Sequence, residues 1–285
     1  MPLFSTMPSA EKAPTFVVGA TGTVGRRLTR QLADECRPVR AATRHPDRYD
    51  CPAAAEPVRF DMTDPSTHAS ALEGAESVFL MAPSDTDAYG QLVPFIDAAA
   101  AAGVERVALM TAMGVDQAPD EMPLRAAELH LRKSDLAATI LRPVYFMENW
   151  SQFTGDAIRE GQLPQPLSPD TALQQIATGD IGAFAALAFA NPDDWIGRAV
   201  ELAGDELTMT ETGEAFSRVL SRDVEHVQVP WDVFEEQSGE EMTVMYRWFE
   251  DVGYDADIEA LRETPPGLQR LEPFLREHGW DTTIA

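Results

Sequence analysis

A glycine-rich segment near the amino terminus constrains the fold of this chain more than any other feature. Residues Gly19–Gly25 read Gly-Ala-Thr-Gly-Thr-Val-Gly. The β-branched and aromatic residues of Thr15–Val18 precede this segment and predict a buried strand, and apolar residues at helical spacing in Thr23–Leu32 follow it. A strand, a glycine turn and a helix in this order are typical of a corner that presents backbone amides to phosphate groups. The sequence therefore predicts a diphosphate site at this corner.

Strands alternate with helices along the first half of the chain. Further strands are predicted at Val39–Thr43, Val58–Phe60, Ser77–Met81, Arg106–Met110 and Thr139–Leu141. Helices are predicted at Leu92–Ala102 and Arg125–Arg132. This alternation predicts an α/β fold of the Rossmann type, in which a doubly wound parallel sheet binds its ligand beyond the carboxyl ends of its strands.

The second half has a looser pattern and predicts a smaller C-terminal α/β substrate lobe. Helices are expected at Ile181–Ala190, Thr210–Leu220, Met242–Val252 and Leu271–His278, with a strand at Ala199–Leu202 and a Pro-rich loop at Gly161–Asp170. We therefore expect a flexible leader over residues 1–13, a nucleotide-binding Rossmann domain over 14–150 and the substrate lobe over 151–285, with some segments of the lobe returning to the sheet.

The chain is strongly acidic, with a formal charge of −25 from 47 acidic residues against 22 lysines and arginines. This charge fits a salt-rich cytoplasm or a GC-rich genome, and it repels nucleic acid and anionic membranes, so neither is expected as a partner. No apolar run approaches the roughly 18 residues of a membrane span. Cys36 and Cys51 lack the spacing of metal ligands. We expect a cytoplasmic protein without a metal, as a monomer or a homodimer.

An island of arginines interrupts this acidity. Between residues 26 and 48 there are seven arginines and three acids, a local excess of +4. Where NAD-binding sites usually carry an acid for the ribose, the second strand ends in Ala-Thr-Arg-His. Arg44 can hold a 2′-phosphate, with Thr43 as a further donor and Arg40 or Arg48 as a second charge. The segment favours NADP(H) over NAD(H), and a solvated helix face is the alternative explanation of the island.

Six segments, spread over nearly the whole chain, form a more specific pattern. They are Gly19–Gly25, Thr43-Arg44-His45-Pro46, Leu141-Arg142-Pro143, Phe146-Met147-Glu148-Asn149, Glu201–Thr210 and Phe274–Trp280. In these segments the chain resembles the NmrA-like family of atypical short-chain dehydrogenase/reductase proteins. The resemblance implies a Rossmann fold that binds NADP(H). It also implies a range of roles, from reductases of quinones and of other aromatic or conjugated molecules to redox-sensing regulators.

The resemblance also implies roles for individual residues. The residues expected at the pyrophosphate are Gly19, Thr21, Gly22, Thr23 and Val24, beside Gly25 of the same corner. Arg44 is expected at the 2′-phosphate. Those expected at the adenine and the nicotinamide ribose are Asp61, Met62, Met81, Ala82 and Pro83, although Asp61 could instead cap a helix. The nicotinamide and substrate side is expected to hold Tyr145, Phe146 and Asn149.

The sequence lacks the residues that donate a proton in other members of the superfamily. Classical members place a lysine four residues after a tyrosine, whereas the residue four before Lys133 is Leu129. NmrA-like reductases often carry a Lys or His where this chain has Leu124. Thr111 alone remains of the two hydroxyl residues expected after the fifth strand, and Tyr145 is the remaining phenol. Both are candidate catalytic and cofactor-contacting residues, and Tyr145 could equally be a pocket wall.

Two hypotheses about activity follow. Hydride transfer to a quinone or an activated conjugated bond could draw its proton from water, and the chain would then be an NADPH-dependent oxidoreductase. The alternative is a non-catalytic regulator that senses NADP(H), and a weaker alternative is an epimerase or ether reductase on the same scaffold. The side chains expected to line the pocket are Met113, Phe146, Asn149, Trp150 and Trp231. Their aromatic character favours a quinone-like or other flat aromatic substrate, unless they form ordinary core.

Overall fold

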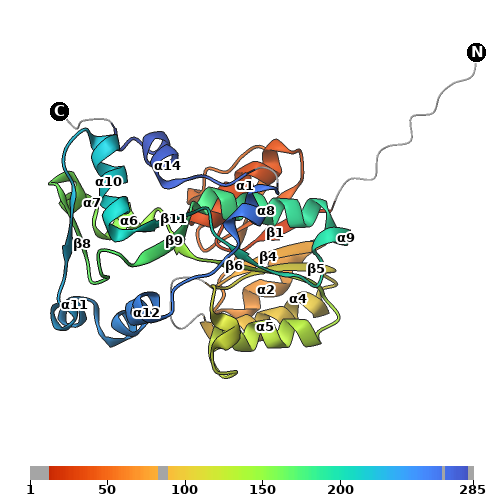
Figure 1. The fold of residues 1–285 in the computed structure, drawn as a ribbon. Coiled ribbons are helices and arrows are strands. Elements are labelled where there is room, and N and C mark those ends of the chain that lie inside the picture. The colour runs from red at the N-terminus through yellow and green to blue at the C-terminus, as the bar shows by residue number, and fades with distance from the viewer. Residues whose placement is uncertain (1–12, 83–88, 265–266, 282–285) are drawn as a thin grey trace, which may run out of the picture. The chain divides into compact units, whose positions relative to one another are not determined.

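A computed structural model describes residues 13–82, 89–264 and 267–281 of the chain (Figure 1). The expected leader, apart from residue 13, and the expected site residue Pro83 therefore lie outside the described residues. The chain divides into two compact units. Unit 1 comprises Met1–Met110, Pro119–Ile140 and Ala185–Arg198, and unit 2 comprises Thr111–Ala118, Leu141–Phe184 and Ala199–Ala285. The units interleave along the chain, and the assignment of residues 14–150 and 151–285 to separate roles stays a prediction.

Seven strands form one sheet in the order β10-β6-β5-β4-β1-β2-β3. They are β1 (Thr15–Val17), β2 (Val39–Thr43), β3 (Ala55–Arg59), β4 (Ser77–Met81), β5 (Arg106–Met110), β6 (Ala137–Pro143) and β10 (Ala199–Leu202). The neighbouring strands from β3 to β5 all pair in parallel. The strand order reverses beside β1, so the edge beyond the carboxyl ends of β1 and β4 is the place where this topology binds ligands. The Rossmann-type α/β prediction is confirmed.

Unit 1 packs its helices on this sheet through apolar faces. Its helices are α1 (Thr23–Asp34), α2 (His68–Leu72), α4 (Leu92–Ala101), α5 (Pro123–Lys133) and α9 (Pro192–Trp195), with short 3-10 turns η1 (Pro46–Arg48) and η2 (Pro65–Thr67). Helix α4 packs beside α2 and α5, as Figure 1 shows. The rings of Phe16 of β1, Phe60 and Phe95 of α4 pack together in the buried core of unit 1, mostly edge to face. These buried rings fix the strands whose ends carry the glycine corner.

Unit 2 contains two smaller sheets and the remaining helices. Its strands are β7 (Tyr145–Phe146), β8 (Gln162–Gln165), β9 (Ala172–Ile176), β11 (Asp205–Thr208) and β12 (Glu225–Gln228), paired in the orders β11-β9-β7 and β12-β8. Its helices are α6 (Asn149–Phe153), α7 (Gly155–Arg159), α10 (Met209–Leu220), α11 (Trp231–Ser238), α12 (Glu240–Asp251), α13 (Ile258–Arg262) and α14 (Leu271–Glu277), and η3 is Val115–Gln117. Helix α8 (Thr178–Ala190) runs from unit 2 into unit 1.

One expected loop is a strand. The sequence predicts a Pro-rich loop at Gly161–Asp170, and this is wrong for its first part, because β8 pairs in parallel with β12 through Gln162 and Glu225. The segment is short and polar and contains Pro164, so it shows no alternation of apolar residues. Its pairing is decided by β12, which lies more than 60 residues further along the chain.

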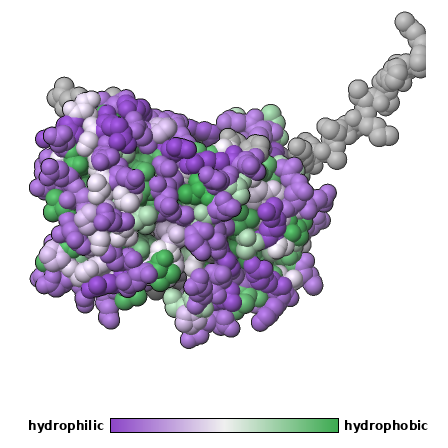
Figure 2. Space-filling view, viewed as in Figure 1, coloured by the Kyte–Doolittle hydropathy of each residue, from purple (hydrophilic) through white to green (hydrophobic). Residues whose placement is uncertain are grey.

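The face of the protein in Figure 2 is predominantly polar. The face in Figure 2 is covered largely by hydrophilic residues, with apolar residues in small separate groups. None of the helices in the described part of the chain is long and apolar enough to cross a lipid bilayer.

Candidate functional site

The glycine corner of unit 1 has the geometry that a diphosphate requires. Gly19 adopts φ +69°, and the Gly22 amide donates to the Gly19 carbonyl at 2.8 Å, which closes a tight turn after β1. A Cβ at Gly25 would overlap the Gly19 carbonyl group, so only glycine lets α1 start this close to the strand. Gly22 is the N-cap of α1 and supplies no side-chain cap, which leaves first-turn amides of the helix to an anion. The corner therefore fits a pyrophosphate.

The other predicted residues of this corner divide into two groups. Thr21 and Thr23 are exposed beside Gly22, whereas Val24 is fully buried and anchors α1 to the core. The Arg26 guanidinium donates to the Thr21 carbonyl at 2.9 Å and braces the turn. Backbone amides and threonine hydroxyls are thus the groups that this corner can offer to phosphate oxygens.

The end of β2 lies next to the glycine corner, because β1 and β2 are hydrogen-bonded parallel neighbours. Arg44 is exposed, and the Thr43 hydroxyl accepts the amide of His45 at 3.2 Å, which shapes the turn that carries Arg44. Sequence reasoning missed Tyr49, whose hydroxyl donates to the Ala20 carbonyl at 2.9 Å and ties this turn to the glycine corner. A tyrosine six residues after a strand gives no pattern that would have identified this contact.

The structure accounts for part of the arginine island without a ligand. Arg40 donates to the carbonyls of Ser70 and Ala71 and forms an ion pair with Glu56 at 3.2 Å, so its charge serves the end of α2. Arg37 donates to the Phe189 carbonyl, and burial lowers its pKa. Arg44 and Arg48 remain exposed beyond β2.

The residues expected at the adenine and ribose have mixed environments. The Asp61 carboxylate accepts the amide and the hydroxyl of Thr63, at 3.0 and 2.8 Å, so it closes a local turn and is not a helix N-cap. Met62 is buried in the core of unit 1. The Met81 sulfur packs against Gly19, at 3.0 Å from the position of a Cβ on that glycine, and Ala82 follows it at half-burial. Met81 thus supports the glycine corner from β4.

In unit 2 the loop after β5 is held against the following strand. The Thr111 amide donates to the Leu141 carbonyl and the Met113 amide to the Pro143 carbonyl, at 2.9 and 3.1 Å. Thr111 and Met113 are both buried. The Trp248 ring of α12 packs on the same loop at Gly114.

Tyr145 lies at the start of the second unit's aromatic core. The side chain is 6% exposed, and its hydroxyl oxygen is buried, with no hydrogen bond of ordinary length to any of the described residues. Burial, and next the neighbouring Tyr246, raise the pKa of the Tyr145 phenol well above its usual value, so it stays protonated at neutral pH. The side chains of Tyr246 and Asn149 also act on the pKa of this phenol, so they are its polar neighbours.

The remaining residues expected in the substrate pocket differ in exposure. Phe146 and Asn149 are half-buried. Trp150 is fully buried, its indole N–H donates to Gln175 at 2.8 Å, and its ring supports that of Tyr145 with centroids 5.1 Å apart. The Trp231 ring is covered by the Arg247 guanidinium at 4.0 Å.

Glu148, part of the Phe-Met-Glu-Asn segment, holds the start of α8. Its carboxylate accepts the Thr178 amide at 3.0 and 3.1 Å and also the Thr178 hydroxyl. Asp180, in the first turn of the same helix, accepts the Gln269 amide at 2.8 Å. Burial is the main reason that the pKa of Asp180 rises from 3.8 to about 6, with Glu148 and Glu277 as further causes. These carboxylates organise the backbone of unit 2.

Arg142, of the Leu-Arg-Pro segment, is buried between two carboxylates of unit 2. Its guanidinium lies 3.3 Å from Asp116 and 3.7 Å from Glu201. Burial, then Asp116 and Asp255, raise the pKa of Glu201, while Arg142 opposes this shift. No sequence spacing links Arg142, Asp116, Glu201 and Asp255, because they come from the 3-10 turn η3, two strands and the segment after α12. Within the described residues, no group of three or more His, Cys, Asp and Glu side chains is arranged to hold a metal ion.

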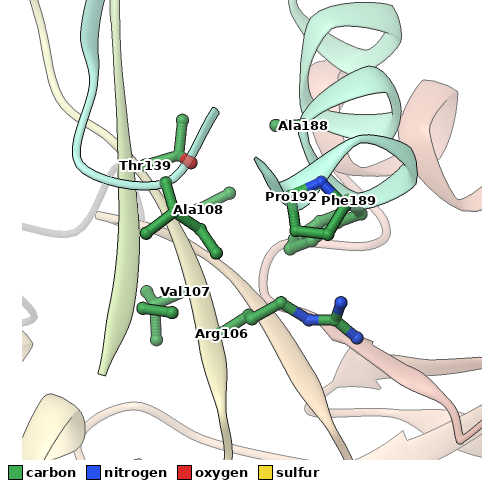
Figure 3. Close-up of a pocket in the computed structure, with 9 residues that line it drawn as sticks. Arg106, Val107, Ala108, Thr139, Ala188, Phe189 and Pro192 are labelled. Atoms are coloured by element: carbon green, nitrogen blue, oxygen red, sulfur yellow. The ribbon is translucent and has the colours of Figure 1, made fainter. Parts of the chain in front are cut away.

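A shallow pocket in unit 1 lies at the other end of the sheet. Figure 3 shows Arg106, Val107 and Ala108 of β5 facing Ala188, Phe189 and Pro192. Arg106 is the first residue of β5, so this pocket is near the amino ends of the strands, whereas Rossmann sheets bind ligands beyond the carboxyl ends. The pocket contains none of the residues predicted for the site.

Comparisons with known proteins agree with this geometry. The family model described as the NmrA-like family matches residues 11–266. The NAD(P)H azoreductase of Xenophilus azovorans is 29% identical over 240 residues, which cover 81% of this chain and 80% of the azoreductase.

Two solved structures share the fold. The triphenylmethane reductase of Citrobacter sp. in complex with NADP(H) superposes with a TM-score of 0.78 at 16% identity, over 93% of this chain and 99% of the reductase. NmrA, a negative transcriptional regulator solved with NADP, superposes with a TM-score of 0.76 at 21% identity, over 94% and 95%. A family match over nearly the whole sequence, together with a Rossmann sheet and its glycine corner, shows that this chain belongs to the NmrA-like family.

Proposed function

We propose that this protein is an NADPH-dependent oxidoreductase that transfers a hydride to a conjugated, quinone-like or other aromatic small molecule. The observation that carries the proposal is the glycine corner, where Gly25 leaves no space for a side chain and the first amides of α1 are left uncapped. The azoreductase relative, which acts with NAD(P)H, supports this class of reaction.

The residues around the corner support a preference for the phosphorylated cofactor. Arg44 is exposed on the turn that Tyr49 ties to the glycine corner. A guanidinium there binds a 2′-phosphate, whereas the ribose hydroxyls of NAD would call for an acid. In this proposal Thr21, Thr23 and the corner amides hold the pyrophosphate, and Met81 and Ala82 border the nicotinamide ribose.

The bound cofactor would supply the hydride, and the chain would supply geometry and a proton. Tyr145 is the proposed proton donor, since burial keeps its phenol protonated and its hydroxyl makes no hydrogen bond of ordinary length to the described residues. Thr111 is proposed as a second hydroxyl near the reacting groups. Met113, Phe146 and Asn149 are proposed to line the substrate pocket, with Trp150 and Trp231 supporting them from behind.

A titration and a turnover assay test the proposal together. Purified protein should bind NADPH, and the bound NADPH should be consumed in the presence of a panel of quinones, azo compounds and enones. NADPH oxidation at the rate of the protein-free blank across the whole panel would reject the oxidoreductase. Failure to bind either nicotinamide dinucleotide would reject the cofactor site itself.

A regulator that senses NADP(H) is the second candidate function. It is supported by the fold shared with NmrA and by the missing Tyr-x-x-x-Lys pair. A regulator would bind NADPH and NADP+ and oxidise nothing, and its affinity for a protein partner would differ between the two cofactor states. Turnover therefore separates the two candidates.

A further inference from the structure

The turn after β2, residues 44–49, is held in shape by local hydrogen bonds. The Thr43 hydroxyl accepts the amide of His45 at 3.2 Å, and two further amides of the turn donate to the carbonyls of His45 and Pro46, at 3.0 and 3.2 Å. Pro46 is the first residue of η1, where its fixed φ favours the helical turn. We call this segment the arginine turn, because it starts with Arg44. Its local bonds join close neighbours in the sequence, so they give the turn a shape and leave its far end to be attached elsewhere.

One side chain attaches the far end of the arginine turn to the glycine corner. The Tyr49 hydroxyl donates to the Ala20 carbonyl at 2.9 Å, and the two residues are 29 positions apart in the sequence. Ala20 is fully buried, so this bond satisfies an acceptor in the interior of unit 1. Burial also raises the pKa of the half-buried Tyr49 phenol above its usual value, so the hydroxyl keeps the proton that it donates.

The glycine corner has contacts of its own that do not involve this tyrosine. The Gly22 amide closes the corner on the Gly19 carbonyl at 2.8 Å, and the Arg26 guanidinium braces the Thr21 carbonyl at 2.9 Å. Gly25 packs directly against the Gly19 carbonyl group. Loss of the tyrosine hydroxyl should therefore loosen the arginine turn while the corner keeps its shape.

The corner and the turn hold different parts of one ligand in the proposed function. The corner fits the pyrophosphate, which NADPH and NADH share, and Arg44 suits the 2′-phosphate, which only NADPH carries. Both phosphate groups are attached to the same adenosine, so their separation is limited by the ligand itself. A ligand that carries both groups gains most when the two subsites already lie at a matching separation before it binds. A bond between the corner and the turn therefore favours the phosphorylated cofactor.

We propose that Tyr49 is a positioning residue that sets the preference of this protein for NADPH over NADH, because it holds Arg44 at a fixed place relative to the glycine corner. The inference rests on the proposed function and adds a specificity-determining residue to its cofactor site. In this role Tyr49 acts through Arg44 and not by contact with the cofactor.

Tyr49→Phe tests the role directly, since it removes the hydroxyl and keeps the ring. The Kd for NADPH should rise by about three- to tenfold, the range expected when one neutral hydrogen bond is lost. The Kd for NADH should change by less than about twofold, because the corner keeps its own contacts. An equal rise for both cofactors would overturn the proposal, since it would show that Tyr49 supports the corner and not the choice of cofactor.

Thr139→Val is the matched control in unit 1. The Thr139 hydroxyl also donates to a backbone carbonyl of a distant segment, that of Trp195, at 2.9 Å. It belongs to the pocket at the other end of the sheet (Figure 3). Both variants should lower the melting temperature slightly, and only Tyr49→Phe should change the ratio of the two dissociation constants. A change of this ratio in the control as large as in Tyr49→Phe would overturn the specific role of Tyr49.

A double-mutant cycle tests whether Tyr49 acts through Arg44. In an Arg44→Ala background, Tyr49→Phe should change the Kd for NADPH by less than about twofold, because the guanidinium that it positions is already gone. A loss as large as in the wild-type background would show that the two residues act independently and would overturn the proposal.

Hydrogen exchange gives a readout that needs no cofactor. In the free protein, Tyr49→Phe should speed exchange at the amides of the arginine turn by about threefold or more, while the amides of α1 exchange as before. Unchanged exchange in the arginine turn would overturn the proposed attachment. If the wild-type protein bound neither dinucleotide, the proposed function and the role of Tyr49 would both be rejected. If Tyr49→Phe bound both dinucleotides with the wild-type preference, only the role of Tyr49 would be rejected.

Discussion

The Gly19 carbonyl occupies the space that a side chain on Gly25 would need. These two residues belong to the strand side and the helix side of one corner, so their contact fixes how closely α1 approaches β1. Because α1 starts this close to β1, its uncapped first-turn amides lie at the turn that joins the strand to the helix. The packing of α1 and the proposed binding of the cofactor therefore depend on the same missing Cβ.

Gly25→Ala should damage both properties. The new methyl group would meet backbone atoms that cannot rotate away, so α1 must shift, at a cost of about 1–3 kcal/mol in the free energy of unfolding. The affinity for NADPH should fall by at least about tenfold, because the amides move with the helix. Thermal unfolding and a fluorescence titration with NADPH measure the two effects.

Gly179→Ala is the matched control, because no atom lies within 4 Å of a Cβ at Gly179. This variant should keep its melting temperature and its affinity for NADPH. If Gly25→Ala behaved like the control, the corner would not have the described geometry.

Arg44→Ala should weaken the binding of NADPH far more than the binding of NADH. Loss of a charged hydrogen bond costs about 1.5–3 kcal/mol, which corresponds to roughly a 10- to 150-fold rise in the Kd for NADPH. The Kd for NADH should change by less than about threefold. Arg30→Ala removes the same charge from an exposed position on α1 and should leave the ratio of the two constants unchanged. An equal loss for both cofactors in Arg44→Ala would contradict the assignment.

Tyr145→Phe should separate chemistry from stability. The hydroxyl makes no hydrogen bond of ordinary length to the residues that the structure describes, so its removal should leave the melting temperature close to that of the wild-type protein. The kcat for a neutral quinone should fall by about 10²-fold or more if the phenol donates the proton. A loss of stability with an unchanged kcat would show that Tyr145 is only a packed ring.

The activity of the wild-type protein should not show the ionisation of Tyr145 at neutral pH. Burial raises the pKa of this phenol well above its usual value, so the protonated form persists through the ordinary assay range. We therefore expect that kcat for a quinone does not decline between neutral pH and about pH 9 through loss of the Tyr145 proton. A decline in this range that disappears in Tyr145→Phe would contradict the expected rise in pKa.

Asp180 should make the protein more stable at mildly acidic pH. The pKa of its carboxyl is about 6 in the folded protein and 3.8 as an ordinary value, so the folded state binds more protons between these two pH values. Stability should therefore fall as pH rises from about 4 to about 6, by at most about 3 kcal/mol from this group, and then level off. Denaturant unfolding as a function of pH measures this contribution.

Asp180→Asn should flatten that dependence. The amide oxygen can still accept the Gln269 amide, and the cost of a buried charge above pH 6 disappears. The loss in the free energy of unfolding between pH 4.5 and pH 7 should therefore be smaller in the variant than in the wild-type protein. An unchanged pH dependence would show that another group is responsible.

Local sequence patterns were sufficient for much of the central sheet. Strands β2, β4, β5 and β10 have the bounds that the sequence predicts, because each is a short run made mostly of apolar or β-branched residues. The helix α1 and its glycine corner were predictable for the same reason, since a strand, a turn and a helix within 20 residues leave few alternatives.

The candidate site was less predictable where contacts join distant segments. The Tyr49 contact to Ala20, the buried hydroxyl of Tyr145 and the Arg142 cluster depend on residues that no spacing connects. The strand β8 was missed because a polar, Pro-containing segment becomes a strand only when β12 pairs with it.

The sequence by itself therefore determined the Rossmann sheet, the glycine corner and the position of the arginine that we propose distinguishes the two cofactors, since these follow from backbone freedom and short-range pattern. Only the tertiary structure decided which polar groups are buried and which carboxylates share one guanidinium. Burial and electrostatic coupling are properties of three-dimensional neighbourhoods, and residues such as Asp116 and Glu201, 85 positions apart, become neighbours only when the chain has folded.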